Sequence, residues 1–265
     1  MPKVIDIASG LDHMLMLDVE GKLWEMGVTL MGQRTSKRHW HYYLQPRRVG
    51  QKSMNHGVKF RAVRCGSHYN LAISKDNDLY TWGQNNYLQC GHPTRKNQFN
   101  PELIALPSKV NFNDQTVKLR DVGAGTHTTI ALDTSGRLWS FGRNGSFELG
   151  RETKVPPKQI INGKLQMHEN EPEADLPKQI TSIDKPVFKV SVGPNHWFAV
   201  TEDSSTYAVG DNSEFRTGLA QEEGMSRFVK VFHDGNLRQD FEVIDLSAGS
   251  NTSVFLLKRV QRRKV

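Results

Sequence analysis

The fold is decided by one stretch, Arg64-Cys65-Gly66-Ser67-His68-Tyr69-Asn70-Leu71-Ala72-Ile73, followed by Leu79-Tyr80-Thr81-Trp82-Gly83-Gln84-Asn85-Asn86. Its two glycines, Gly66 and Gly83, are 17 residues apart. The same spacing separates Gly10 and Gly27, Gly125 and Gly142, and Gly193 and Gly210, and a fifth copy begins at Gly249. A fixed spacing that recurs in this way is typical of a repeat architecture.

Positions are numbered here from the first glycine of each copy. Apolar residues recur at −3, +5 and +7, and every complete copy has an aromatic residue at +14: Trp24, Tyr80, Trp139 and Tyr207. Short apolar runs joined by turns such as 18–21 and 133–136 predict β-hairpins. A further extended piece with proline, at 46–49, 101–104 and 157–160, predicts an edge strand. Four strands in each unit of 56 to 68 residues predict the blade of a β-propeller.

The motif resembles the repeat of the regulator of chromosome condensation family. The pattern is clear over residues 64–86, and it recurs over 125–132 and 138–145 with Glu148-Leu149-Gly150 at its end. The first copy departs from it, with Glu25-Met26-Gly27-Val28 in place of the Trp-Gly-x-Asn element. The resemblance covers nearly the whole chain. It implies an all-β fold, a β-propeller that usually has seven blades in that family.

We expect one propeller domain over residues 1–258 and a basic C-terminal tail over 259–265. The repeats lie near 4–58, 60–118, 119–186 and 187–240, with a half repeat at 241–257. Two inserts, 28–58 and 151–186, break the regularity, and the second contains a polar, acidic stretch from Asn162 to Asp175 that predicts a loop.

The chain starts and ends in the same phase of the repeat, which leaves three alternatives. The ring is small, or the propeller is open and another chain covers its edges, or the sequence is a shortened form of a longer protein. An uncovered sheet edge promotes aggregation. We therefore expect a stable protein partner, or the chain's own loops, to cover the edge.

Composition narrows the class of protein. The chain has 265 residues, 37% of them hydrophobic, a net charge of +7 and two cysteines. No run of about 18 apolar residues could span a membrane, and the N-terminus has no apolar signal-peptide core. Two cysteines exclude a disulfide scaffold and a four-thiolate zinc site. These features predict an intracellular protein, nuclear or cytoplasmic, with no membrane association.

Motifs for catalysis are missing from the sequence. There is no Gly-x-Ser-x-Gly, no phosphate-binding loop and no His-Glu-x-x-His, so we expect a non-enzymatic protein without a cofactor or metal. Histidines recur at +2 or +3 as His13, His68, His127 and His196. We interpret them as structural, with a metal-binding ring as the alternative. His39, His41, Cys90 and His92 are alternative zinc ligands, although solvated loop residues fit them better.

The expected partner-binding surface has two parts. The first is a set of turn residues that share one face of the propeller: Asp12, His68, His127, Asn195 and Asn251. The second is a basic and aromatic set in the 28–58 insert: Arg34, Lys37, Arg38, Trp40, Tyr42, Arg47 and Arg48. Arginine and lysine contact phosphates while Trp and Tyr stack on bases, but the same residues also anchor protein interfaces. A third alternative is a solvated loop whose Trp40 and Tyr42 cover the open edge.

These observations predict a protein-interaction platform, or an assembly or regulatory subunit, that uses the loop face of a propeller. The resemblance implies an alternative, guanine-nucleotide exchange on a small Ran-type GTPase, the activity of the family's founding member. That member uses a projecting wedge hairpin, for which the sequence offers no clear match. A further alternative is chromatin or RNA binding through the basic insert and tail. It predicts an affinity that falls steeply with salt.

Overall fold

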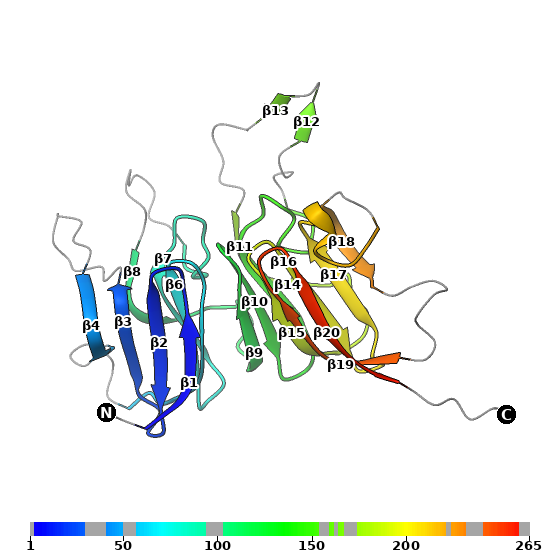
Figure 1. The fold of residues 1–265 in the computed structure, drawn as a ribbon. Coiled ribbons are helices and arrows are strands. Elements are labelled where there is room, and N and C mark those ends of the chain that lie inside the picture. The colour runs from blue at the N-terminus through cyan, green and yellow to red at the C-terminus, as the bar shows by residue number, and fades with distance from the viewer. Residues whose placement is uncertain are drawn as a thin grey trace.

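A computed structural model describes residues 3–29, 41–49, 57–93, 103–153, 159–161, 164–166, 174–220, 224–231 and 241–259. In these ranges every regular element is a strand except one 3-10 turn, η1 (Ser213–Phe215). The strands form four-stranded antiparallel sheets that stand side by side (Figure 1). The expected all-β propeller fold is therefore confirmed.

Each sheet is one blade, and its strands pair in chain order. Blade A contains β1 (Val4–Ser9), β2 (His13–Asp18), β3 (Leu23–Thr29) and β4 (His41–Arg48). Blade B contains β5 (Phe60–Cys65), β6 (Tyr69–Ser74), β7 (Leu79–Gln84) and β8 (Leu103–Lys109). Blade C contains β9 (Leu119–Ala124), β10 (Thr128–Asp133), β11 (Leu138–Arg143) and β14 (Ala174–Ile180). Blade D contains β15 (Val187–Val192), β16 (His196–Thr201), β17 (Thr206–Gly210) and β18 (Met225–Lys230), and β19 (Phe241–Ala248) pairs with β20 (Ser253–Arg259) in a half blade.

Neighbouring blades meet through their first strands. Strand β1 contacts β5, β5 contacts β9, β9 contacts β15, and β15 contacts β19. The blades therefore follow one another in chain order, from blade A at one end to the half blade at the other (Figure 1).

A hydrophobic cluster fills each junction between blades. At the first junction, the +5 and +7 residues Leu15 and Leu17 of β2 cluster with the −6 and −3 residues Phe60 and Val63 of β5. The same four positions recur at the next junctions: Leu71 and Ile73 with Leu119 and Val122, Ile130 and Leu132 with Val187 and Val190, and Phe198 and Val200 with Val243 and Leu246. Burial of each such side chain contributes roughly 1.5–3 kcal/mol, so contact between neighbours is the main source of stability.

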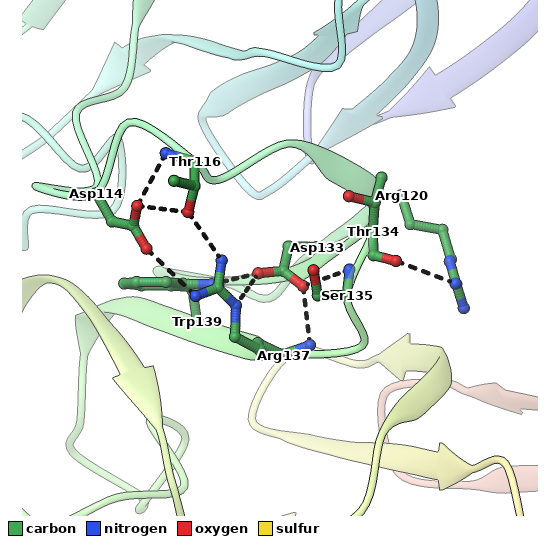
Figure 2. A network of polar contacts seen from close by, with 8 residues as sticks. All are labelled: Asp114, Thr116, Arg120, Asp133, Thr134, Ser135, Arg137 and Trp139. Atoms are coloured by element: carbon green, nitrogen blue, oxygen red, sulfur yellow. Dashed lines mark hydrogen bonds and ion pairs between the residues drawn. The ribbon is translucent and has the colours of Figure 1, made fainter.

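The aromatic position +14 is tied to the hairpin turn between the second and third strands. In blade C the buried Asp133 carboxylate accepts hydrogen bonds from Trp139 Nε1 at 3.3 Å and Arg137 Nε at 2.6 Å (Figure 2). In blade A, Asp18 accepts from Trp24 Nε1 at 2.8 Å. Blades B and D have tyrosine at +14 and Ser74 or Thr201 in place of the aspartate. The indole N–H and the carboxylate therefore occur together.

The third repeat differs from expectation. The fourth strand, predicted at residues 157–160, is β14 (Ala174–Ile180), so Ala174 and Asp175 belong to a strand and not to the acidic loop. An ion pair holds the start of β14 in place, because Arg151 Nη1 lies 3.0 Å from Asp175 Oδ2. Residues 159–161 (β12) pair instead with 164–166 (β13) in a separate hairpin. In the first repeat, residues 41–48 of the expected 28–58 insert form β4 and complete blade A.

The second glycine of each repeat is required by a close approach. Gly142 has a φ of 105°, and a Cβ atom there would lie 2.3 Å from the carbonyl oxygen of His127. That carbonyl accepts a hydrogen bond from the backbone N–H of Arg143 at 2.9 Å, which ties the first turn to the third strand. The conformation and the missing side chain are therefore both needed.

Gly142→Ala is expected to destabilise the protein more than Gly218→Ala. Gly218 also has a positive φ, 76°, but nothing lies within 4 Å of its would-be Cβ. The control then costs about 1 kcal/mol for conformation alone, and Gly142→Ala costs at least about 2 kcal/mol because the turn must also move. Urea unfolding of both variants measures the difference. Equal costs would show that the close approach is unimportant.

Candidate protein-binding face

Strand alternation gathers two kinds of connection at one end of every blade. Connections after the first and third strands lie at this end, and connections after the second strand lie at the other, because neighbouring strands are antiparallel. We call this end the turn face. It comprises the first turns, residues 10–12, 66–68, 125–127, 193–195 and 249–252, and the third-strand loops, residues 85–91, 144–150 and 212–218.

The five predicted turn residues all lie on the turn face. Asp12 and Asn251 are exposed, whereas His68, His127 and Asn195 are half-buried. The backbone carbonyls of Asp12, His68, His127 and Asn195 accept hydrogen bonds from the backbone N–H of the residue that follows the second glycine, which is Val28, Gln84, Arg143 and Asp211 in turn. The backbone is thus held firmly while part of each side chain faces outward.

Two of the recurring histidines connect neighbouring blades. His13 Nε2 lies 3.0 Å from Asn70 Oδ1, and His196 Nε2 lies 2.9 Å from Ser253 Oγ. Burial, reinforced by the nearby Arg216, lowers the pKa of His196 to about 4. Burial also lowers the pKa of His13. Both rings are therefore neutral at physiological pH, which suits a structural role.

A third histidine belongs to a stack of rings on the turn face. His127 lies 4.9 Å from the ring of Tyr87, and the Arg143 guanidinium lies 5.5 Å from the centre of the same ring. Burial, with Arg143 and His68 nearby, lowers the pKa of His127 to about 4. Tyr87 comes from blade B and the other two from blade C, so the stack crosses a blade junction.

Each third-strand loop is closed by a buried asparagine at +19. The Oδ1 atoms of Asn85, Asn144 and Asn212 accept hydrogen bonds from the backbone N–H at +24, over 2.9 to 3.0 Å. Three residues later, each loop places a bulky apolar residue in the left-handed region: Leu88 with φ 61°, Phe147 with φ 66° and Phe215 with φ 56°. Such residues rarely adopt this conformation, because Cβ approaches the following carbonyl group.

The next residue of each loop is hydrogen-bonded to the following blade through its backbone carbonyl. The carbonyl oxygens of Gln89, Glu148 and Arg216, at +23, accept hydrogen bonds from side chains at +4 of the next repeat. The donors are Thr129 Oγ1 at 2.8 Å, Trp197 Nε1 at 2.7 Å and Ser253 Oγ at 2.7 Å. Sequence reasoning missed these loops. The available signal was the bulky apolar residue that all three loops have at +22.

The second part of the expected surface is divided. Arg47 and Arg48 end strand β4 opposite Glu25 and Trp24, at the end of the blade away from the turn face. Tyr42 lies near the start of β4, opposite Val28. Arg34, Lys37, Arg38 and Trp40 lie outside the described residues, as do His39 and the tail after residue 259.

The described ranges contain no group of three or more His, Cys, Asp or Glu residues placed to hold a metal ion. Cys90 is buried with its Sγ 3.3 Å from the Gln84 carbonyl, and His92 Nε2 lies 2.9 Å from Thr81 Oγ1. Both side chains thus contact residues of β7 and hold the loop that follows this strand. Nor does this part of the chain include a helix with the length and apolar character of a membrane span.

Family models decide the classification. Two models of the regulator of chromosome condensation (RCC1) repeat match residues 76–132 and 135–200, and 60–89 and 119–147. Together they span residues 60–200, more than half of the chain. The chain belongs to the RCC1 repeat family. The first turns and third-strand loops described above are thus connections within and between RCC1 repeats.

Relatives of this RCC1-repeat chain extend the match to nearly its whole length. The human regulator of chromosome condensation is 27% identical, over 96% of this chain and 58% of that protein. The guanine nucleotide exchange factor SRM1 of Saccharomyces cerevisiae is 28% identical, over 95% of this chain and 50% of that protein. The solved structure of yeast RCC1 (Prp20) bound to Kap60 has a TM-score of 0.77 at 25% identity, over 97% of this chain and 54% of that one. The chain thus spans between 50% and 58% of the length of these three relatives.

A pH-dependent contribution to stability follows from His196, which has no exposed surface. Its pKa is about 4 in the folded protein and about 6.5 when unfolded. Between these values the unfolded state binds the extra proton, so stability decreases as the pH falls from 6.5 towards 4. His196→Gln removes this contribution and keeps a polar group beside Ser253. From pH 7 to 4, the wild type is expected to lose up to about 3 kcal/mol relative to the variant.

Urea unfolding at several pH values tests this expectation. The comparison with His196→Gln is needed because burial raises the pKa of Glu25 to about 7. The contribution of Glu25 to stability therefore increases as the pH falls over the same range, which opposes the effect of His196. A difference between wild type and variant that stays constant from pH 7 to 4 would contradict the assignment.

Proposed function

We propose that the chain is a non-enzymatic protein-interaction platform whose turn face binds a protein partner. The observation that carries this proposal is the recurrence of Leu88, Phe147 and Phe215 at one loop position in the left-handed conformation. Strained residues persist when the surrounding structure holds them in place, and they are concentrated at functional sites. Phe215 is also half exposed, so packing alone does not account for it.

The surroundings of these residues suit a binding surface. Asn85, Asn144 and Asn212 close the loops, and the backbone carbonyls at +23 bond to the next blade, so the loops lose little conformational freedom on binding. The stack of Tyr87, His127 and Arg143 adds aromatic and cationic groups, which are enriched in protein interfaces. Variable connections on a rigid scaffold are where such folds carry function.

Phe215→Gly separates binding from folding. Glycine tolerates the positive φ at this position. The free energy of unfolding of the variant is therefore expected to equal that of the wild type or to exceed it by up to about 1 kcal/mol. The lost ring is expected to reduce partner retention several-fold. The measurement is affinity purification of the tagged chain from its native cell, with a high-salt wash and quantitative mass spectrometry, alongside thermal unfolding of the purified variant.

Val19→Ala is the matched control, because Val19 is similarly exposed but lies in the hairpin turn at the opposite end of blade A. Partner retention that is unchanged in Phe215→Gly, or reduced equally in Val19→Ala, would contradict a role for the turn face. Binding that disappears in the salt wash and reappears with nucleic acid at low salt would favour the basic segments instead.

Guanine-nucleotide exchange is the second candidate, and the hairpin β12–β13 favours it. The hairpin departs from the connection between β11 and β14 and projects from the turn-face end, away from the sheets (Figure 1). An element that stands clear of a rigid scaffold can insert into a partner. The relatives named as an exchange factor and as regulators of chromosome condensation support testing this activity.

Release of labelled GDP from a Ran-type GTPase measures the activity directly. The intact chain at micromolar concentration is expected to accelerate release, and replacing residues 159–166 by a Gly-Ser linker is expected to remove most of the acceleration. Phe215→Gly serves as a folded comparison with the hairpin intact. If the intact chain leaves the release rate unchanged, the exchange function is excluded, while the platform proposal is still tested by partner retention.

A further inference from the structure

Arg143 is a half-buried cation without an anion beside it. It ends β11 at the turn face, and its side chain forms no hydrogen bond or ion pair with any residue that the structure describes. Four other half-buried arginines are each ion-paired with an aspartate: Arg64, Arg137, Arg151 and Arg216. Taking a charge out of water without a counter-ion costs free energy. The N–H donors of the Arg143 guanidinium are therefore available to an anion that comes from elsewhere.

The guanidinium has a prepared position. It lies 5.5 Å from the centre of the Tyr87 ring. It also lies against Gly145, where a Cβ atom would be 2.8 Å from both Nε and Nη2 of Arg143. The φ angle of Gly145 is not positive, so the backbone conformation does not require glycine at this position. The space that Arg143 occupies does require it.

The tyrosine is itself held in place from blade C. The backbone N–H of Tyr87 donates a hydrogen bond to Gln89 Oε1 at 2.8 Å. Gln89 is fully buried, and its backbone carbonyl accepts a hydrogen bond from Thr129 of blade C. The His127 ring packs against the Tyr87 ring as well. The guanidinium of Arg143 is thus positioned before an anion binds, which reduces the entropic cost of binding.

The surroundings of Arg143 match a single negative charge. His127 is neutral at physiological pH, because burial lowers its pKa to about 4 with Arg143 and His68 nearby. Within the turn face as defined above, the one Lys or Arg is Arg216, and it lies 3.1 Å from Asp211. A phosphate group carries nearly two negative charges at pH 7. A carboxylate carries one and accepts two parallel hydrogen bonds from a guanidinium, so it fits this site better.

We propose that Arg143 binds the carboxylate of an aspartate or glutamate on the protein partner of the turn face. This inference rests on the proposed function, because it names the chemistry of the partner at that surface. The guanidinium donates two N–H···O hydrogen bonds to the carboxylate, while Tyr87 and Gly145 keep its plane in position. The contact neutralises a cation that the described fold leaves unpaired. It also places the acidic residue of the partner at the junction between blades B and C.

A titration with a small carboxylate tests the site without the partner. The probe is N-acetylglutamic acid amide, whose one carboxylate belongs to the side chain, and NMR follows the Nε–H resonance of Arg143 at pH 7. We expect a saturable shift of this resonance. In Gly145→Ala the cation is retained but the guanidinium is displaced, so we expect binding of the probe to be several-fold weaker.

Two other anions are the controls of this titration. Sodium chloride is added to the same ionic strength, and inorganic phosphate is titrated over the same range of concentration. A shift that chloride reproduces would show that Arg143 has no carboxylate site. Tighter binding of phosphate than of the carboxylate would overturn the assignment to an acidic side chain.

Partner retention tests the same residue in the native cell. The tagged full chain is purified with a wash at physiological salt, and mass spectrometry quantifies the partner. Arg143→Gln is expected to reduce retention about tenfold, because the carboxylate of the partner is then left without its counter-ion. Gly145→Ala is expected to reduce it several-fold. Unchanged retention in Arg143→Gln would contradict the proposal.

Arg120→Gln is the matched control. It removes the same charge from an exposed arginine of the same blade, but Arg120 lies near the start of β9, at the end away from the turn face. Equal loss of the partner in Arg120→Gln would show that net charge, and not the site, is responsible. Thermal unfolding completes the comparison. A loss of stability in Arg143→Gln as large as in Gly142→Ala would show that the guanidinium serves the fold and would contradict the proposal.

Phe215→Gly separates this inference from the proposed function. Loss of the partner in Phe215→Gly with unchanged retention in Arg143→Gln would contradict the inference and leave the proposed function standing. Unchanged retention in Phe215→Gly with a loss in Arg143→Gln would contradict the role proposed for Phe215 and support the inference. Unchanged retention in both variants would contradict both.

Discussion

Contact between the apolar sides of neighbouring blades is the interaction on which the rest of the structure depends. A single four-stranded sheet has two sides to bury and no core of its own, so residues such as Leu15 and Leu17 are buried only because Phe60 and Val63 follow. The glycine at +17 lets the third strand pass the first turn closely enough for this packing. The loop carbonyls at +23 then accept hydrogen bonds from the next blade at the turn-face end of the same junction.

The sequence predicted the blades well where the signal is local and repeated. Paired glycines, short apolar runs and the aromatic position +14 all report on hairpins within a few residues of each other. The prediction failed in the third repeat, where the fourth strand depends on a contact between Arg151 and Asp175 across a long insert. The hairpin β12–β13 had a readable signal, the Asn162-Gly163 pair between short apolar runs, but the acidic residues that follow pointed to a loop.

The turn face could be predicted in part. Antiparallel pairing places the turns of every repeat at one end, so Asp12, His68, His127, Asn195 and Asn251 were expected to share a surface. The sign of φ at Leu88, Phe147 and Phe215 could not be read from residue types that normally avoid this conformation. The hydrogen bonds between blades could not be predicted from the sequence either. Their acceptors are backbone carbonyls, and their donors differ in type among Thr129, Trp197 and Ser253.

A row of blades stabilised by contacts between neighbours behaves as a one-dimensional cooperative array. Blades B, C and D each have a neighbour on both sides, whereas blade A and the half blade have one. Protection of backbone amides against hydrogen exchange is therefore expected to be highest in blades B, C and D. The loop carbonyls at +23 bond across the same junctions, so a change in the packing between two blades also reaches the loops of the turn face beside it.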